Sequence, residues 1–141
     1  MKIYLASSLN ADCRPDMYAA VNMLRDKGFE VYSPIEHKIP NDWDYPNTEW
    51  GLMVFTADLM AIEASDILVI LSCGRNSTAG ANWEAGYAYA KGKKVIVVEM
   101  TDEVMSLMVA NGRYATVKGL DGLASYDWDT MPKTRTETEQ K

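Results

Sequence analysis

Cysteine is scarce in this sequence of 141 residues, in which Cys13 and Cys73 are the only two. They lie far apart along the chain and belong to no CxxC motif or Cys/His pair. Neither a disulfide framework nor a structural zinc site is therefore expected. We expect two free thiols in a reducing cytoplasm.

Positive charge is also in short supply. The formal net charge is -6 at pH 7, the sequence pI is about 4.7, and no run of Lys or Arg occurs. Contacts with the phosphate backbone of DNA or RNA are therefore not expected to be the main function of the protein. A small molecule is the better candidate for its partner.

Long hydrophobic runs are absent from the sequence as well. No segment approaches the ~20 apolar residues of a membrane span, and the apolar run at the N-terminus is too short for a signal peptide. We expect a soluble, cytoplasmic protein that does not associate with membranes.

Short apolar runs alternate with helical patterns along the chain. Continuous apolar strands such as 66–72, with the sequence DILVILS, are typical of a parallel sheet that helices cover on both faces. The alternation predicts one doubly wound α/β domain over residues 1–129, followed by a polar, disordered tail over 130–141. The expected strands are 3–6, 29–32, 66–72, 94–98 and 114–117, and the expected helices are 12–27, 50–64, 79–91, 103–110 and 120–125.

Two loops follow strands of this expected sheet. Residues 33–47 form a long irregular segment that contains His37, the only histidine, and residues 73–78 follow the central strand. Ligands of open parallel sheets bind beyond the carboxyl ends of the strands, so we expect both loops to border one pocket. Taken alone, His37 is more often structural or exposed than catalytic.

Glu84 lies on the expected helix 79–91, where its neighbours on the same face are unusual for a glutamate. Four small or aromatic residues share its helical face: Gly80, Ala81, Tyr87 and Ala88. Small residues let a helix approach the sheet closely and leave room for a ligand above the carboxylate. We interpret Glu84 as a functional residue, the alternative being a solvated glutamate on an amphipathic helix.

Asp58 is a second carboxylate of interest, on the expected helix 50–64. It lies at the edge of an apolar stripe, although a solvated Asp is common on helices. Retaining cleavage of a glycosidic bond needs a carboxylate nucleophile and a proton donor about 5 to 5.5 Å apart. Glu84 and Asp58 are candidates for that pair.

Ser77 and Thr78 directly precede the expected helix 79–91. Hydroxyls and backbone N–H groups at a helix N-terminus suit a phosphate or a ligand hydroxyl, but Ser and Thr also cap helices that bind nothing. Both interpretations stay open at this point. Gly80 and Gly86 form neither a GxGxxG nor a Walker pattern, so a dinucleotide or triphosphate ligand is not supported.

Several segments of the chain together resemble one family. They are KIYLASSL, DLMAIEASDILVIL, GANWEAGYAYAKGKKVIVV and SLM, in this order. Over nearly the whole chain, to about Trp128, the sequence resembles the nucleoside 2-deoxyribosyltransferases and the related 2'-deoxynucleoside 5'-monophosphate N-hydrolases. The Glu-x-Gly-x-Ala pattern that begins at Glu84, with the lysine-rich turn and strand after it, is the most specific part.

The resemblance implies a flavodoxin-like five-stranded sheet, a homodimer or larger oligomer with shared active sites, and no metal or organic cofactor. It implies that Glu84 attacks the anomeric carbon and forms a 2-deoxyribosyl ester, that Tyr4 orients this glutamate, and that Asp58 protonates the departing base. The implied substrate is a 2'-deoxynucleoside or its 5'-monophosphate. The preferred base, and whether another base or water accepts the sugar, stay open.

The two branches of the family differ at the 5' end of the sugar. Hydroxyl residues are typical of the hydrolases at the positions of Ser8, Thr78 and Ser106, the last from a neighbouring subunit. Hydroxyls donate hydrogen bonds to a phosphate that a carboxylate would repel, so these residues favour a 5'-monophosphate. The phosphate-binding arginine of the hydrolases falls at Asn10, so the branch stays open. The expected substrate-binding residues are Ser8, Asn10, His37, Ser77, Thr78, Gly80 and Ser106.

Two other classes of protein remain as alternatives. An inactive nucleotide-sensing module could use the same fold, but it would not need a nucleophile with the supporting Tyr4 and Asp58. A phosphoryl-transfer or response-regulator domain would need an acidic cluster after the first strand, where residues 6–8 read Ala-Ser-Ser. Because one fold serves many functions, the site residues decide between them.

Overall fold

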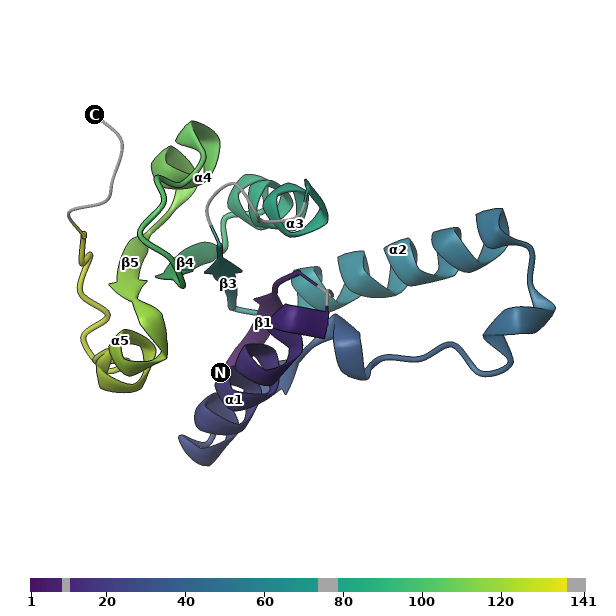
Figure 1. Cartoon of the computed structure of the whole chain (residues 1–141), viewed down its shortest axis with the longest axis horizontal. Helices are drawn as coiled ribbons and strands as arrows, with labels where there is room; N and C mark the ends of the chain where they lie inside the picture. Colours follow the sequence, from purple (N-terminus) through teal and green to yellow (C-terminus); the bar gives the residue numbers. More distant parts are fainter. Residues whose placement is uncertain (9–10, 74–78, 137–141) are drawn as a thin grey trace.

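The computed structural model describes residues 1–8, 11–73 and 79–136. Its centre is a five-stranded parallel sheet with the order β2-β1-β3-β4-β5 (Figure 1). The strands are β1 (Lys2–Ala6), β2 (Glu30–Tyr32), β3 (Ile67–Ser72), β4 (Lys94–Glu99) and β5 (Ala115–Lys118). From β1, the chain adds β2 on one side and β3, β4 and β5 on the other, so the strand order switches between β1 and β3. This switch confirms the expected flavodoxin-like, doubly wound α/β architecture.

Helices cover both faces of the sheet (Figure 1). On one face lie α1 (Arg14–Asp26) and α5 (Gly119–Ser125), and on the other lie α2 (Asn47–Ala64), α3 (Ala79–Ala90) and α4 (Leu107–Gly112). Each face has its own cluster of buried apolar side chains. Within the described ranges, no helix combines the length and the hydrophobicity that crossing a bilayer requires.

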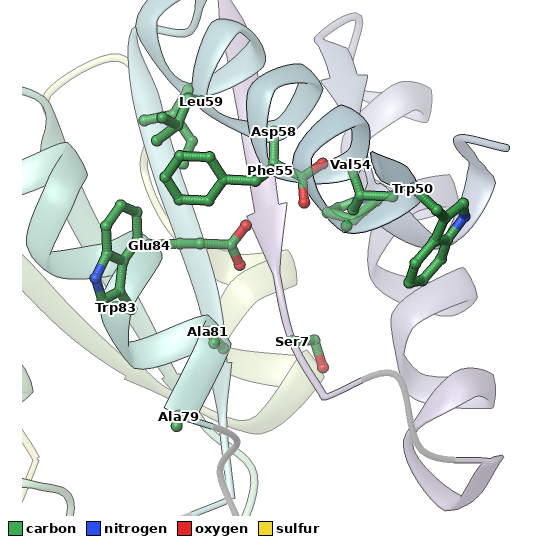
Figure 2. Close-up of a pocket in the computed structure, with 14 residues that line it drawn as sticks. Ser7, Trp50, Val54, Phe55, Asp58, Leu59, Ala79, Ala81, Trp83 and Glu84 are labelled. Carbon is green, nitrogen blue, oxygen red and sulfur yellow. The ribbon is translucent and has the colours of Figure 1, made fainter. Parts of the chain in front are cut away.

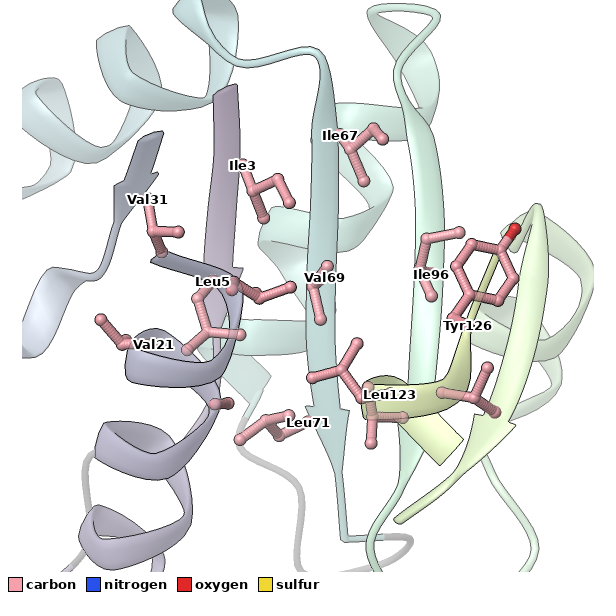
Figure 3. Close-up of a cluster of buried hydrophobic side chains, with 14 of the residues drawn as sticks. Ile3, Leu5, Val21, Val31, Ile67, Val69, Leu71, Ile96, Leu123 and Tyr126 are labelled. Atoms are coloured by element: carbon pink, nitrogen blue, oxygen red, sulfur yellow. The ribbon is translucent and has the colours of Figure 1, made fainter. Parts of the chain in front are cut away.

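The apolar pattern of the sequence explains these two layers. All six residues of β3 are buried, as expected for a central parallel strand with helices on both sides. Helix α1 buries Met17, Ala20, Val21 and Leu24, whose spacing places them on one stripe facing the sheet. Figure 3 shows the cluster that this stripe forms with the inward side chains of the strands and of α5.

A glycine ends α1 and turns the chain toward β2. Gly28 has a positive φ of 95°, a conformation that costs glycine little, and its N–H donates to the carbonyl of Arg25 at 2.9 Å. The N–H of Phe29 donates to the carbonyl of Leu24 at 3.2 Å. The carbonyl groups of the last turn of α1 therefore have hydrogen-bond partners just before β2 begins.

One expected helix is wrong in its position. Helix α4 spans Leu107–Gly112 rather than 103–110, because Ser106 is its N-cap and accepts a hydrogen bond from the N–H of Val109 at 3.5 Å. The other expected helices and strands lie within three residues of their observed ends. Boundaries of this kind depend on capping contacts, which a periodic pattern does not contain.

The expected disordered tail over 130–141 is corrected for residues 130–136. The N–H of Thr116 donates to the carbonyl of Thr134 at 2.9 Å, and the hydroxyl of Thr134 donates to the carbonyl of Thr116 at 2.7 Å. The hydroxyl of Tyr126 donates to the carbonyl of Pro132 at 2.8 Å. This C-terminal segment therefore covers the edge strand β5; residues 137–141 lie outside the described residues.

Helix α2 projects away from the sheet over much of its length (Figure 1). Ile62 is its one fully buried residue. Leu52 and Met60 are 64% and 65% exposed, and Phe55 is 47% exposed. A helix that is apolar on several sides is typical of one that another chain covers.

Candidate active site

Tyr4 and Glu84 form the centre of the candidate site. Tyr4 lies on β1 with no exposed surface, and Glu84 lies on α3, which packs over the same face of the sheet. The hydroxyl of Tyr4 donates a hydrogen bond to Oε2 of Glu84. The fold thus holds the glutamate through a residue of the neighbouring strand.

Asp58 reaches the same space from α2. Figure 2 shows the carboxylates of Asp58 and Glu84 directed into the gap between α2 and α3. The hydroxyl of Tyr32 donates to Oδ1 of Asp58 at 3.4 Å. The rings of Tyr32 and Tyr4 stack with centroids 5.5 Å apart, so the two tyrosines support the two carboxylates side by side.

Burial makes Glu84 an unusual carboxylic acid. Loss of solvent raises its pKa to about 7; the charge of Asp58 adds to the rise, and the hydrogen bond from Tyr4 opposes it. Burial beside Glu84 and Asp58 also raises the pKa of Tyr4, so this hydroxyl stays protonated and remains a hydrogen-bond donor. Near neutral pH, the neutral acid and the carboxylate of Glu84 are therefore present in comparable amounts.

The pKa of Asp58 is also raised by burial. The hydrogen bond from Tyr32 and the positive charge of a protonated His37 both oppose the rise. Burial raises the pKa of Tyr32 to about 12, with Asp58 as the next cause, so Tyr32 is a donor across the physiological range. A carboxyl with a raised pKa is better able to hold a proton that it can pass to a substrate.

A cavity of about 710 Å³ opens above the two carboxylates. Its volume is in the range of small-molecule sites, and most of its lining is apolar or aromatic. The rings of Phe55 and Trp83 lie 5.5 Å apart on one wall. The lining residues are Ser7, Pro34, Trp50, Gly51, Val54, Phe55, Asp58, Leu59, Ile62, Ala79, Gly80, Ala81, Trp83 and Glu84.

Only some of the expected substrate-binding residues lie at or near the cavity in the described structure. Gly80 lines the cavity, and His37 lies beside Tyr32 with ring centroids 5.9 Å apart. Ser8 is buried beyond β1, and Ser106 is an exposed cap of α4; neither is among the residues that line the cavity. Asn10, Ser77 and Thr78 lie outside the described residues.

Sequence reasoning missed several residues of the site. Tyr32 pairs directly with Tyr4 in the register of β1 and β2, so aligning the two strands as parallel neighbours would have pointed to it. Ser7 and the aromatic lining residues Trp50, Phe55 and Trp83 had no such signal. They meet only because α2 and α3 pack over the carboxyl end of β1.

The chemistry available at this site comes from two carboxyl groups and two tyrosine hydroxyls beneath an apolar cavity. No Lys or Arg appears among the described lining residues. In the part of the chain that the structure describes, no cluster of His, Cys, Asp or Glu has the arrangement of a metal site. The arrangement suits nucleophilic attack by one carboxylate and proton transfer by the other.

Fold and site together define a flavodoxin-like α/β protein with a half-buried carboxylate pair in an apolar pocket. A family model for nucleoside 2-deoxyribosyltransferase matches residues 3–125. This match covers most of the chain, and the chain belongs to the nucleoside 2-deoxyribosyltransferase family.

Individual relatives agree with this assignment. A nucleoside deoxyribosyltransferase of Lactobacillus johnsonii is 30% identical over 84 residues, which are 57% of this chain and 56% of that protein, so the match spans just over half its length. The structure of a 2-deoxyribosyltransferase from Bacillus psychrosaccharolyticus superposes with a TM-score of 0.88 at 31% identity, covering 96% of this chain and 99% of the other. A CMP N-glycosidase from Clostridium botulinum, at 17% identity, shares the fold with a TM-score of 0.57, over 96% of this chain and 86% of the other.

Proposed function

We propose that this protein cleaves the N-glycosidic bond of a 2'-deoxynucleoside or its 5'-monophosphate through a covalent 2-deoxyribosyl ester on Glu84. The sugar then passes to another base or to water. The observation that carries the proposal is the Glu84 carboxylate, which Tyr4 holds at the floor of a cavity that Asp58 also faces. Membership of the family supports the choice of bond.

In the first step, an ionised oxygen of Glu84 attacks the anomeric carbon of the sugar. The bond between this carbon and the base nitrogen breaks, and its electron pair leaves with the base. Asp58 donates its proton to the departing base, which avoids release of a nitrogen anion. Tyr4 keeps its proton and orients the attacking carboxylate.

In the second step, the acceptor attacks the same carbon and the ester bond to Glu84 breaks. The acceptor is a nitrogen of a second base or the oxygen of water, and its proton passes to Asp58. Glu84 regains its charge, and the protonation state of the pair returns to its starting point. Two displacements at one carbon retain its configuration, as in retaining glycosidases.

The apolar wall of the cavity supports a planar base as the leaving group. Trp50, Phe55 and Trp83 line the space next to the carboxylates. Aromatic side chains stack on flat rings and exclude water, which strengthens charge interactions within the site. Phe55 and Asp58 both belong to α2 and line the same cavity, so a base held there would lie near Asp58.

The test of the reaction is product analysis. Each deoxynucleoside and each deoxynucleoside monophosphate is incubated with the protein, with and without a second free base, and products are separated by chromatography. Release of free base alone indicates a hydrolase, whereas a new nucleoside indicates a transferase. The matching ribonucleosides are expected to react far more slowly, because a 2'-hydroxyl strengthens the glycosidic bond inductively.

The test of the covalent step uses Glu84→Gln, with Glu63→Gln as its matched control. Glu63 is an exposed glutamate whose side chain contacts Tyr87 and Lys91 outside the cavity. We expect Glu84→Gln to lose turnover with its fold intact and Glu63→Gln to keep it. Intact mass spectrometry should detect one deoxyribosyl adduct on the parent, and peptide mapping should place it on Glu84. Full activity in Glu84→Gln would contradict the proposal.

Two alternatives make different predictions in the same assays. A protein that is only a 5'-monophosphate N-hydrolase would release base from the monophosphates and would never pass the sugar to a second base. An inactive nucleotide-sensing module would bind a nucleotide, detectable by calorimetry, and would release no base from any substrate. The hydrogen-bonded pair of Tyr4 and Glu84 favours an enzyme over the sensor, since a sensor needs no oriented nucleophile.

A further inference from the structure

Arg25 and Glu36 form an ion pair that is held by two hydrogen bonds. The guanidinium of Arg25 donates to one carboxylate oxygen of Glu36 at 2.9 Å and to the other at 2.7 Å. It also donates to the carbonyl of Val31 in β2 at 2.9 Å. Arg25 lies in the last turn of α1, and Glu36 ends η2 (Pro34–Glu36), a short 3-10 turn just beyond β2. A single side chain therefore ties α1 to the edge strand of the sheet and to the turn that follows it.

The turn η2 contacts both faces of the sheet. Pro34 lines the cavity on the side of α2 and α3, whereas Ile35 packs against the apolar cluster on the side of α1 and α5. His37 follows the turn, and its ring lies 5.9 Å from the ring of Tyr32, whose hydroxyl donates to Asp58. A shift of η2 would therefore change the lining of the cavity and the surroundings of Tyr32.

The turn has few hydrogen bonds of its own. The N–H of Glu36 donates to the carbonyl of Ser33 at 3.0 Å, and the N–H of His37 donates to the carbonyl of Pro34 at 3.2 Å. Hydrogen bonds of a 3-10 turn have poorer geometry than those of an α-helix, so a single turn holds its position weakly. We propose that Arg25 is a positioning residue, which acts through Glu36 to hold residues 34–37 against the substrate cavity.

The form of the contact suits a positioning role. A guanidinium that binds both oxygens of one carboxylate fixes the direction of the contact as well as its length. The Arg25 and Glu36 side chains are 42% and 37% exposed, so water weakens the attraction between their charges. We therefore expect the pair to affect the position of η2 more than the stability of the whole fold.

Hydrogen exchange of the full chain without substrate tests the contact directly. Arg25→Ala and Glu36→Ala should each raise the exchange rate of peptides that cover residues 33–38 about fivefold. Peptides that cover β4 report on global unfolding and should not change. Lys2→Ala is the matched control, because Lys2 and Glu30 form an exposed ion pair of 3.7 Å at the amino ends of β1 and β2, away from the cavity. An unchanged rate over residues 33–38 in Arg25→Ala would overturn the proposal.

The double variant Arg25→Ala/Glu36→Ala shows whether the two side chains act through each other. If they do, the double variant should exchange over residues 33–38 at the rate of Arg25→Ala alone, because removing the arginine already breaks the contact. Additive effects of the two substitutions would mean that each side chain acts independently, and the proposal would be wrong.

Steady-state kinetics tests the effect on the substrate, and this part rests on the function proposed above. Pro34 lines the cavity but takes no part in the proposed chemistry, so loss of its position should weaken binding of substrate and transition state equally. Arg25→Ala should therefore raise KM about fivefold and keep kcat within about twofold of the parent, whereas Lys2→Ala should keep both constants. A lower urea midpoint with an unchanged KM would show a merely structural role and would refute the proposal.

The two proposals fail separately in these experiments. A parent that turns over no deoxynucleoside or deoxynucleotide would refute the proposed function. The exchange rates need no substrate, so they would still decide whether Arg25 holds residues 34–37 in place.

Discussion

The protonation of Glu84 depends on neighbours that act in opposite directions. Burial and the nearby charge of Asp58 favour the neutral acid, whereas the hydrogen bond from Tyr4 favours the carboxylate. The nucleophile of the proposed reaction is the carboxylate, so activity should fall as pH drops through the pKa of Glu84, about 7. The Tyr4 hydroxyl therefore controls both the orientation and the charge of this residue.

Tyr4→Phe should move the acid limb of the kcat/KM profile to higher pH. A hydrogen bond to a charged group contributes about 1.5 to 3 kcal/mol, so losing it should raise the pKa of Glu84, and the limb with it, by about one to two pH units. The measurement is kcat/KM as a function of pH. Tyr87→Phe is the control, because the Tyr87 hydroxyl contacts Glu63 outside the cavity; an unmoved limb in Tyr4→Phe would contradict the argument.

The 5' end of the substrate provides a second prediction at the residue scale. Thr78 precedes α3 in the sequence, and a hydroxyl there favours a 5'-monophosphate, so the parent should prefer the monophosphate at least tenfold. Thr78→Asp should reverse this preference, because its carboxylate repels a phosphate but accepts a hydrogen bond from a free 5'-hydroxyl. The two kcat/KM values in parent and variant decide the matter, and a parent that prefers the free nucleoside belongs with the transferases.

Among the elements, the C-terminal segment has an unexpected structural role. Residues 130–136 lie along β5, and they form hydrogen bonds with the backbone N–H and carbonyl of Thr116 and with the hydroxyl of Tyr126. The hydroxyl of Tyr114 donates to the carbonyl of Met131 at 2.7 Å. An exposed strand edge is a site of unwanted pairing, and this segment covers it.

A chain that stops after residue 129 should be less stable than the parent. It loses the hydrogen bonds to Tyr114, Thr116 and Tyr126, each worth about 1 kcal/mol, so the free energy of unfolding should fall by roughly 2 to 4 kcal/mol. Urea titration followed by circular dichroism measures the change, and a chain that stops after residue 136 is the control. Equal urea midpoints for the two shortened chains would show that residues 130–136 contribute nothing to the stability of the fold.

At the scale of the whole molecule, large apolar side chains are exposed on the face that carries α2, α3 and α4. Leu52 and Met60 of α2, Trp83 of α3 and Met108 of α4 are each more than half exposed, with Met108 at 78%. A soluble domain rarely leaves so much apolar surface in water. We propose that a second copy of the chain covers this face and that the protein is a homodimer or a larger homo-oligomer.

Leu52→Glu or Met60→Glu should therefore dissociate the assembly. A carboxylate placed in an apolar interface loses its hydration without gaining a partner, which opposes association. Sedimentation or light scattering at micromolar protein concentration should give an oligomer for the parent and a monomer for these variants. Tyr18→Glu on α1, a change at an exposed aromatic of the opposite face, is the control. A monomeric parent would refute the proposal.

Much of the fold follows from local pattern. The buried run of β3 and the apolar stripe of α1 are visible in the sequence, because a parallel sheet requires the first and an amphipathic helix the second. The start of α4 at Leu107 did not follow, since it depends on the cap at Ser106. The order of residues 130–136 did not follow either, because polar residues become ordered there only through pairing with β5.

For the site, the sequence alone singled out Tyr4, Asp58 and Glu84, because a carboxylate among small and aromatic residues is unusual on a helix and because the motifs resemble one family. It did not identify Tyr32 or the aromatic residues that line the cavity. Those groups belong to different elements, and their proximity exists only once parallel strands bring their carboxyl ends together. The raised pKa of Glu84 is likewise a tertiary property, since burial by α2 and α3 removes the water that would otherwise stabilise its charge.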